Sequence, residues 1–275
     1  MGDQPAESGG RLTNDPSFTS KRKLNRKRVI LFFASIAIGL LLWQGIVSVF
    51  TLPAFILPSP LQVSRRFVSA IRDGLIQRHL FITLLEVILG LAVGAIMATI
   101  TGYVLAKSAS AEKLISPYLI ASQAIPIVAI APLLVIWFGP GLLSKVLICS
   151  LTVFFPILIN TVVGLREVPQ DLRYLMRSLR ASPAKTLLYL EVPSALPIFL
   201  GGLRVGATLS VIGAIVGELV GSDRGLGFLI NVGRGQYDTA LVFVAVITLV
   251  IMASSLYGLV LLIEKRLLAW QTWRV

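Results

Sequence analysis

Long apolar runs separated by short polar segments make up most of the chain. They lie at about residues 29–50, 80–106, 114–138, 142–164, 194–220 and 240–263. At a rise of about 1.5 Å per residue, each run forms a helix long enough to cross roughly 30 Å of bilayer hydrocarbon. The pattern predicts an all-α integral membrane protein with about six transmembrane helices.

Polar segments at the two ends bound this membrane region. Residues 1–28 are rich in Gly, Ser, Asp and Asn and end in a basic cluster, so we expect a disordered basic tail there. The apolar run that follows is too long for a signal peptide and therefore reads as the first spanning helix. Residues 29–270 form one transmembrane domain, and residues 271–275 form a short C-terminal tail.

Composition agrees with this class, and the charge distribution gives an orientation. Hydrophobic residues make up 56% of the chain and charged residues 14%, with a mean hydropathy of +0.86. Six spans put both termini on one side, where most of the 25 lysines and arginines then lie. Because positive loops stay in the cytoplasm, we expect both termini to be cytoplasmic. The net charge of +12 reflects this topology and does not indicate nucleic-acid binding.

The segment 53–79 on the other side starts with a turn and continues as an amphipathic helix. Proline cannot occupy a helix interior, which makes Leu57–Pro60 a turn. The helix that follows carries Leu61, Phe67, Val68 and Ile71 on one face and arginines on the other. Such a helix is expected to lie along the membrane surface.

Polar residues and prolines in the spans suggest a solute path. The third run contains Pro126 and Pro132, which bend a helix and require compensation by neighbouring helices or a cavity. This run is either a mobile helix lining a path or a statically kinked packing helix. Other polar side chains either face a polar cavity or bond between helices. The candidate path residues are Ser122, Gln123, Pro126, Asn160 and Ser210.

The sequence lacks common motifs of nucleotide-binding and catalytic sites. It contains no GxxxxGK[ST], HExxH or GxSxG motif, so we expect neither nucleotide hydrolysis nor a catalytic site in this chain. Cys149 and His79 are single residues of their types, which leaves no predicted metal site and no cofactor. Glu86 and Glu218 lie near the ends of their spans, where Arg78 or Arg224 could neutralise them.

The polar loop 165–193 interrupts the apolar pattern. Val168-Pro169-Gln170-Asp171 is typical of a helix start, and Ser182-Pro183 of a second start with a serine cap. Glu191-Val192-Pro193 is expected to end the second helix. The first helix carries an apolar stripe opposite three arginines. It is either part of a membrane-surface hairpin or a helix that inserts into a groove of a soluble partner. The stripe is Leu172, Leu175, Met176 and Leu179, opposite Arg173, Arg177 and Arg180.

The loop and several other segments resemble the inner-membrane permease subunits of bacterial type I ABC importers. Leu179-Arg180-Ala181-Ser182 matches the centre of their EAA-type loop and Val192-Pro193 its end, with Tyr174-Leu175-Met176 in place of EAA and Arg180 in place of the usual glycine. Further segments are similar to the branch that carries sulfonates, taurine, nitrate, bicarbonate and thiamine precursors. They are LPSPLQV, IPIVAIAPLLVIWFG, GELVGSDRGLGFLI and EKRLLAW.

The resemblance implies a homodimer of six-helix permeases in the bacterial inner membrane. Its partners would be lipid, two ATPase subunits that bind ATP and Mg, and an extracytoplasmic substrate-binding protein. The loop would supply cytoplasmic coupling helices that contact the ATPases. The contact residues would be Leu175, Met176, Arg177, Ser178, Leu179, Arg180, Ala181, Ser182 and Pro183.

The nature of the solute and two other functional classes stay open at this point. The IPIVAIAPLLVIWFG stretch is closer to permeases for vitamin-related heterocycles, but small anions such as sulfonate, nitrate or bicarbonate fit the same branch. A stand-alone secondary transporter would need ion-coupling residues at mid-membrane and internal symmetry, and neither is seen. A membrane enzyme lacks its catalytic cluster.

Overall fold

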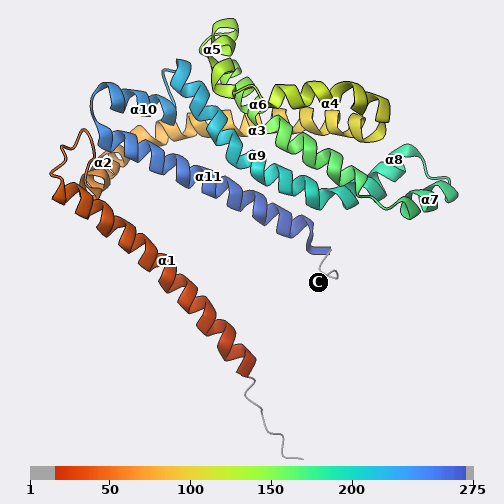
Figure 1. The fold of residues 1–275 in the computed structure, drawn as a ribbon, viewed down its shortest axis with the longest axis horizontal. Helices are drawn as coiled ribbons and strands as arrows, with labels where there is room; N and C mark the ends of the chain where they lie inside the picture. The colour runs from red at the N-terminus through yellow and green to blue at the C-terminus, as the bar shows by residue number, and fades with distance from the viewer. Residues whose placement is uncertain (1–15, 271–275) are drawn as a thin grey trace, which may run out of the picture. The chain divides into compact units, whose positions relative to one another are not determined.

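The computed structural model describes residues 16–270, which divide into a unit up to Pro60 and a unit from Leu61 onward. All regular elements in this range are helices (Figure 1). Only the backbone is described for residues 16–29 and for a few later positions, namely Phe32, Ala109, Ser116, Leu119, Ile120, Ser122 and Gln123.

The first unit contains one long helix, α1 (Pro16–Val49). Its apolar part, Phe33–Val49, corresponds to the first predicted span. The helix begins at Pro16, within the tail expected over 1–28. Proline is favourable at a first helical position, and the lysines, arginines and leucine that follow are good helix formers. The rest of that tail, 1–15, and the C-terminal tail 271–275 lie outside the described residues.

The second unit is built on four helices long and apolar enough to cross a membrane. Three of them, α3, α6 and α9, pack closely along one another, and α10 and α11 pack against α9. The helices of this unit are α2 (Pro60–Arg72), α3 (Leu75–Lys107), α4 (Ala109–Gln123), α5 (Ile127–Phe138), α6 (Leu142–Arg166), α7 (Gln170–Ser178), α8 (Pro183–Thr186), the wide π turn η1 (Leu187–Glu191), α9 (Val192–Gly221), α10 (Leu226–Gly235) and α11 (Thr239–Leu267).

The third predicted span, 114–138, is divided into two helices. α4 ends at Gln123 and α5 begins at Ile127, with Pro126 in an extended conformation between them. Proline has no backbone N–H and disfavours helix in the residue before it, so Pro126 breaks the helix and does not merely bend it. Pro132 lies inside α5, which packs on α6 and α9.

Small residues let the central helices approach one another closely. A Cβ added to Gly90 would lie 2.1 Å from the Cβ of Cys149, and one added to Gly213 would lie 2.8 Å from the Cα of the same residue. Cys149 is therefore held between α3 and α9 and is fully buried. Gly202, Gly206 and Gly217 of α9 likewise lie directly against side chains of α6, as small residues do where helices pack closely.

The two ends of the second unit carry different short helices (Figure 1). At one end, the expected amphipathic helix after Pro60 is confirmed as α2, and Arg66 Nε of this helix donates to Asp238 Oδ2 at 2.8 Å, just before α11. α10 lies at this same end. At the other end, α7 and α8 project beyond the ends of α6 and α9. The loop 165–193 is thus separated from α10 by the length of the spanning helices.

Candidate functional site

The first loop helix, α7, has a defined start and a defined end. It follows Pro169, with Asp171 in its first turn, as predicted. At its end, Arg180 N donates to Arg177 O at 2.9 Å and Ala181 N to Met176 O at 3.0 Å. Arg180 has a φ of 50°. These bonds and the left-handed residue form a Schellman motif, in which the left-handed position usually carries glycine.

The second loop helix starts as predicted but does not end as predicted. The Ser182 side chain accepts a hydrogen bond from Lys185 N at 3.4 Å, and Pro183 takes the first helical position. α8 then continues through η1 into α9, so the expected end at Glu191-Val192-Pro193 is wrong. Val192 N bonds to Leu187 O, one residue further back than in an α-helix. This wide turn accommodates Pro193, which has no N–H to donate.

The predicted contact segment, 175–183, lies largely at the surface. Leu175 is 53% exposed and Leu179 is 68% exposed, and the rest of the segment is exposed apart from the half-buried Met176 and Ala181. Leu172 adds a third exposed leucine one turn before Leu175. Three large apolar side chains in water next to arginines are typical of a surface that a partner covers.

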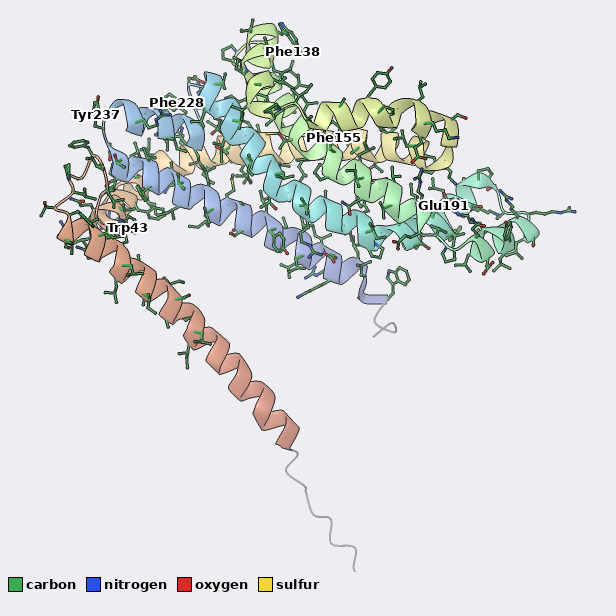
Figure 2. The ribbon with its side chains drawn as sticks, viewed as in Figure 1. Trp43, Phe138, Phe155, Glu191, Phe228 and Tyr237 are labelled. Atoms are coloured by element: carbon green, nitrogen blue, oxygen red, sulfur yellow. The ribbon has the colours of Figure 1, made fainter. Side chains whose placement is uncertain are left out.

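A buried carboxylate anchors this loop to the helix bundle. Glu191 in η1, labelled in Figure 2, is 1% exposed. It forms ion pairs with Lys107, the last residue of α3, and with Arg173 of α7. The Arg173 Nη1–Glu191 Oε1 distance is 3.4 Å, and Arg173 Nη2 also donates to Leu165 O at 2.7 Å. Three segments far apart in the sequence therefore meet at one side chain. An acid between apolar residues in LLYLEVP was the sequence signal for this role.

A second ion pair joins the start of the loop to α4. Arg166, at the end of α6, pairs with Glu112. The hydrogen bond from the guanidinium lowers the pKa of the Glu112 carboxyl below its ordinary value, because it stabilises the charged form.

At the opposite end, side chains of α3 and α9 cap the start of α10. Leu226 N donates to Thr83 Oγ1 at 2.8 Å, and Gly227 N donates to Glu218 Oε2 at 2.5 Å. His79 Nδ1 accepts from Gly225 N at 3.0 Å. A Cβ at Gly225 would lie 2.0 Å from Glu218 Oε1, so only glycine fits there. This arrangement explains the GELVGSDRGLG segment, where an acid precedes two closely spaced glycines.

The acidic residues of the spans have other partners than expected. Glu86 is 1% exposed and pairs with Lys145 Nζ at 3.0 Å, and the same ammonium group donates to Ser222 Oγ at 2.6 Å. Arg224 pairs with the neighbouring Asp223. The proposed neutralisation by Arg78 or Arg224 is therefore wrong, because α6 places a buried lysine closer to the carboxylates.

The candidate path residues do not form one group. Pro126 lines an apolar pocket of about 430 Å³ between α5 and α6, together with Thr152 and Phe155. Asn160 is half-buried, and its Nδ2 donates to Pro156 O, a lining residue of that pocket, at 2.8 Å. Ser210 is fully buried and donates to Ala207 O, so it does not line the pocket. For Ser122 and Gln123 only the backbone, at the end of α4, is described.

Comparisons with known proteins agree on one family. The model of the binding-protein-dependent transport system inner membrane component family matches residues 90–269. The riboflavin transport system permease protein RibX of Chloroflexus aurantiacus is 46% identical over 84% of this chain and 87% of its own. The formylaminopyrimidine transport permease protein ThiX of Halalkalibacterium halodurans is 33% identical over 91% of this chain and 98% of its own.

A solved structure shares the fold. An inward-facing form of the MetNI methionine ABC transporter matches 71% of this chain and 97% of its own chain, with a TM-score of 0.63 at 19% identity. Since the family model covers well over half of the chain and relatives match nearly all of it, the chain belongs to the binding-protein-dependent transport system inner membrane components, the permease subunits of type I ABC importers.

Proposed function

We propose that this chain forms the translocation path for a small solute delivered by an extracytoplasmic binding protein, and that two separate ATPase subunits drive it through the α7–α8 loop. Two copies of the chain would form the pathway. In this proposal both termini and the α7–α8 loop are cytoplasmic. ATP and Mg would bind to the ATPases and not to this subunit.

The observation that carries the proposal is the construction of the loop. Its outer surface presents Leu172, Leu175 and Leu179 to solvent, while Glu191 holds its inner side to the bundle. A water-facing helix with exposed leucines gains free energy by inserting into a groove, at about 25 cal/mol per Å² of apolar area covered. A loop tied to α3, α6 and α9 can pass the position of a bound partner to the spanning helices.

The relatives and the pocket at Pro126 favour a vitamin-related heterocycle as the solute. Identity decreases from 46% with RibX and 33% with ThiX to 29% with the taurine transport system permease protein TauC of Escherichia coli. The pocket is lined mainly by apolar side chains, among them Ile127 and Phe155. The Thr152 hydroxyl donates to Ile148 O and can accept a hydrogen bond from a solute. Such a lining suits a planar heterocycle better than a sulfonate or bicarbonate anion, whose charge would need a cationic or amide-rich lining.

The assembly is tested by replacing the exposed leucines with acids. In the double variant Leu175→Asp, Leu179→Asp, we expect binding to the ATPase subunits to fall at least about tenfold, because each carboxylate would have to be buried without a partner. Tyr237→Asp is the matched control: Tyr237 is 76% exposed at the opposite end, and its positive φ accepts aspartate. Pull-down of the cognate ATPase measures the effect, and unchanged binding in the double variant would contradict the proposal.

The solute class and the energy source are tested in proteoliposomes that contain the permease, ATPase and binding protein. We expect ATP-dependent uptake of a flavin or pyrimidine solute and none of taurine or bicarbonate. Uptake of an anion alone would reject the heterocycle. Uptake by the permease without ATPase would instead support a stand-alone secondary transporter.

A further inference from the structure

A cationic pocket lies on the inner side of α7, away from the exposed leucines. It has a volume of about 370 Å³ and is lined by Arg166, Arg173 and Arg177, with Gln170, Tyr174 and Val168. Residues 170, 173, 174 and 177 occupy one face of α7 because they are three, four and seven positions apart. Leu172 and Leu175 lie on the other face, so the helix presents one surface to a partner and one to this pocket.

The arginines in the pocket are only partly neutralised. Arg166 pairs with Glu112, and Arg173 shares Glu191 with Lys107. Among the described residues, Arg177 has no ion pair or hydrogen bond that occupies its guanidinium. The exposed acids of the same segment, Glu167 and Asp171, are not part of the lining. The pocket therefore carries excess positive charge.

The chemistry of the lining selects a phosphate group. Guanidinium groups bind phosphate through paired hydrogen bonds and are less strongly hydrated than ammonium groups. The Gln170 amide and the Tyr174 hydroxyl add neutral donors beside them. An isolated carboxylate could use the charge, but it would leave more of these donors without an acceptor.

The location of the pocket indicates where the phosphate comes from. It lies at the C-terminal ends of two spanning helices, since Ala106 of α3 and Arg166 of α6 both line it. Arginine and tyrosine at this depth are typical of the interface between acyl chains and water. We propose that the pocket binds the phosphate of an anionic phospholipid headgroup, wedged between α7 and the bundle. The assignment of this end to the cytoplasmic leaflet rests on the proposed function.

The direct test uses the full-length permease without ATPase, so it does not depend on coupling. Native mass spectrometry would compare retention of phosphatidylglycerol with retention of phosphatidylcholine. In Arg177→Gln, we expect the affinity for phosphatidylglycerol to fall about tenfold, as for loss of a hydrogen bond to a charged group, with no change for phosphatidylcholine. Arg180→Gln is the matched control, since Arg180 is exposed in the same loop but does not line the pocket.

Other outcomes would overturn the assignment. Equal retention of phosphatidylglycerol in wild type and Arg177→Gln would show that this pocket does not bind the phospholipid. Competition by inorganic phosphate at the same affinity would assign it to a free anion, and release of lipid on adding the ATPase would assign it to an acidic partner surface. Arg177→Lys keeps the charge but loses the paired geometry, so its affinity for phosphatidylglycerol should lie between those of wild type and Arg177→Gln. If Arg177→Gln does not fold, the comparison of Arg177→Lys with wild type replaces it.

Failure of this test is distinguishable from failure of the proposed function. The double variant Leu175→Asp, Leu179→Asp is expected to lose ATPase binding and keep phosphatidylglycerol, because its substitutions lie on the other face of α7. Loss of both in that variant would overturn the division of α7 into two faces.

Discussion

Among single residues, Arg180 has a backbone conformation that suits its side chain poorly. Its φ of 50° lies in the left-handed region, where the Cβ of an L residue crowds the following carbonyl oxygen. The Schellman motif at the end of α7 requires that conformation, because the amides of Arg180 and Ala181 reach back to Arg177 and Met176. The glycine that permeases of this type usually carry at this position would meet the same requirement without the steric cost.

Replacing Arg180 with glycine is therefore expected to stabilise the protein. The gain should be about 1 kcal/mol, the approximate cost of a left-handed non-glycine residue. Thermal unfolding in detergent measures it, with Arg180→Ala as the control that removes the guanidinium but keeps a Cβ. A lower melting temperature for Arg180→Gly than for Arg180→Ala would contradict this explanation.

At the scale of helices, Glu191 joins elements that are distant in the sequence. Lys107 ends α3, Arg173 belongs to α7, and Glu191 lies in η1 before α9. The carboxylate is almost fully buried, whereas the side chains of Lys107 and Arg173 are 37% and 33% exposed. The anion therefore bears most of the desolvation cost, and two cations share its compensation.

Neutralising this anchor should loosen the loop. In Glu191→Gln, two cations lose their counter-charge, and we expect a loss of about 2 kcal/mol, less than for a fully buried pair because both cations keep contact with water. Limited proteolysis of the segment 167–182 should become faster. Glu167→Gln is the control, since Glu167 is exposed in the same loop. Equal proteolysis rates in the two variants would argue against the anchoring role.

The helix boundaries could be predicted from the sequence where residues close together in the chain determine them. The start of α7 and the Ser182–Pro183 start of α8 depend on residues next to each other in sequence, and both predictions are confirmed. Pro126 and Pro193 show the limit: one breaks a span and the other is absorbed by a wide turn. Which result occurs depends on what surrounds the proline in space.

The polar anchors could not be predicted for the same physical reason. Glu191, Glu218 and Lys145 were visible in the sequence as charges in apolar surroundings, but their partners come from other helices. Sequence distance gave Arg78 and Arg224 as partners because they are the nearest cations along the chain. Packing of α3 against α6 and α9 instead brings Glu86 to Lys145 and Thr83 to Glu218.

For the whole molecule, the division at Pro60 has a measurable consequence. The buried hydrophobic clusters draw their residues from α3, α5, α6, α9, α10 and α11, all of which belong to the second unit. The family match starts at residue 90 and also lies within it. Within the described residues, these clusters are formed by the second unit alone.

Cutting the chain after folding should therefore leave the second unit intact. Residues 53–57 form a turn in which Ile56 N and Leu57 N bond to Pro53 O. With a protease site inserted there, cleavage is expected to change the melting temperature by less than about 2 °C. A site inserted at Asp223 is the control, because it interrupts the short connection between Glu218 and the start of α10 that it caps; its cleavage should lower the melting temperature by more than about 5 °C. An equal drop at both sites would show that the core depends on α1.

The continuity of α8, η1 and α9 makes the segment Pro183–Gly221 a single rod of 39 residues. At about 1.5 Å per residue it is about 58 Å long, roughly twice the thickness of the hydrocarbon layer. Its two ends are Ser182, the cap in the loop, and the turn next to Glu218, which holds α10. A tilt of about 10° about the centre of such a rod moves its ends about 5 Å in opposite directions. In the proposed mechanism such a rod would act as a lever, because a displacement of its loop end would move its other end, next to α10, in the opposite direction.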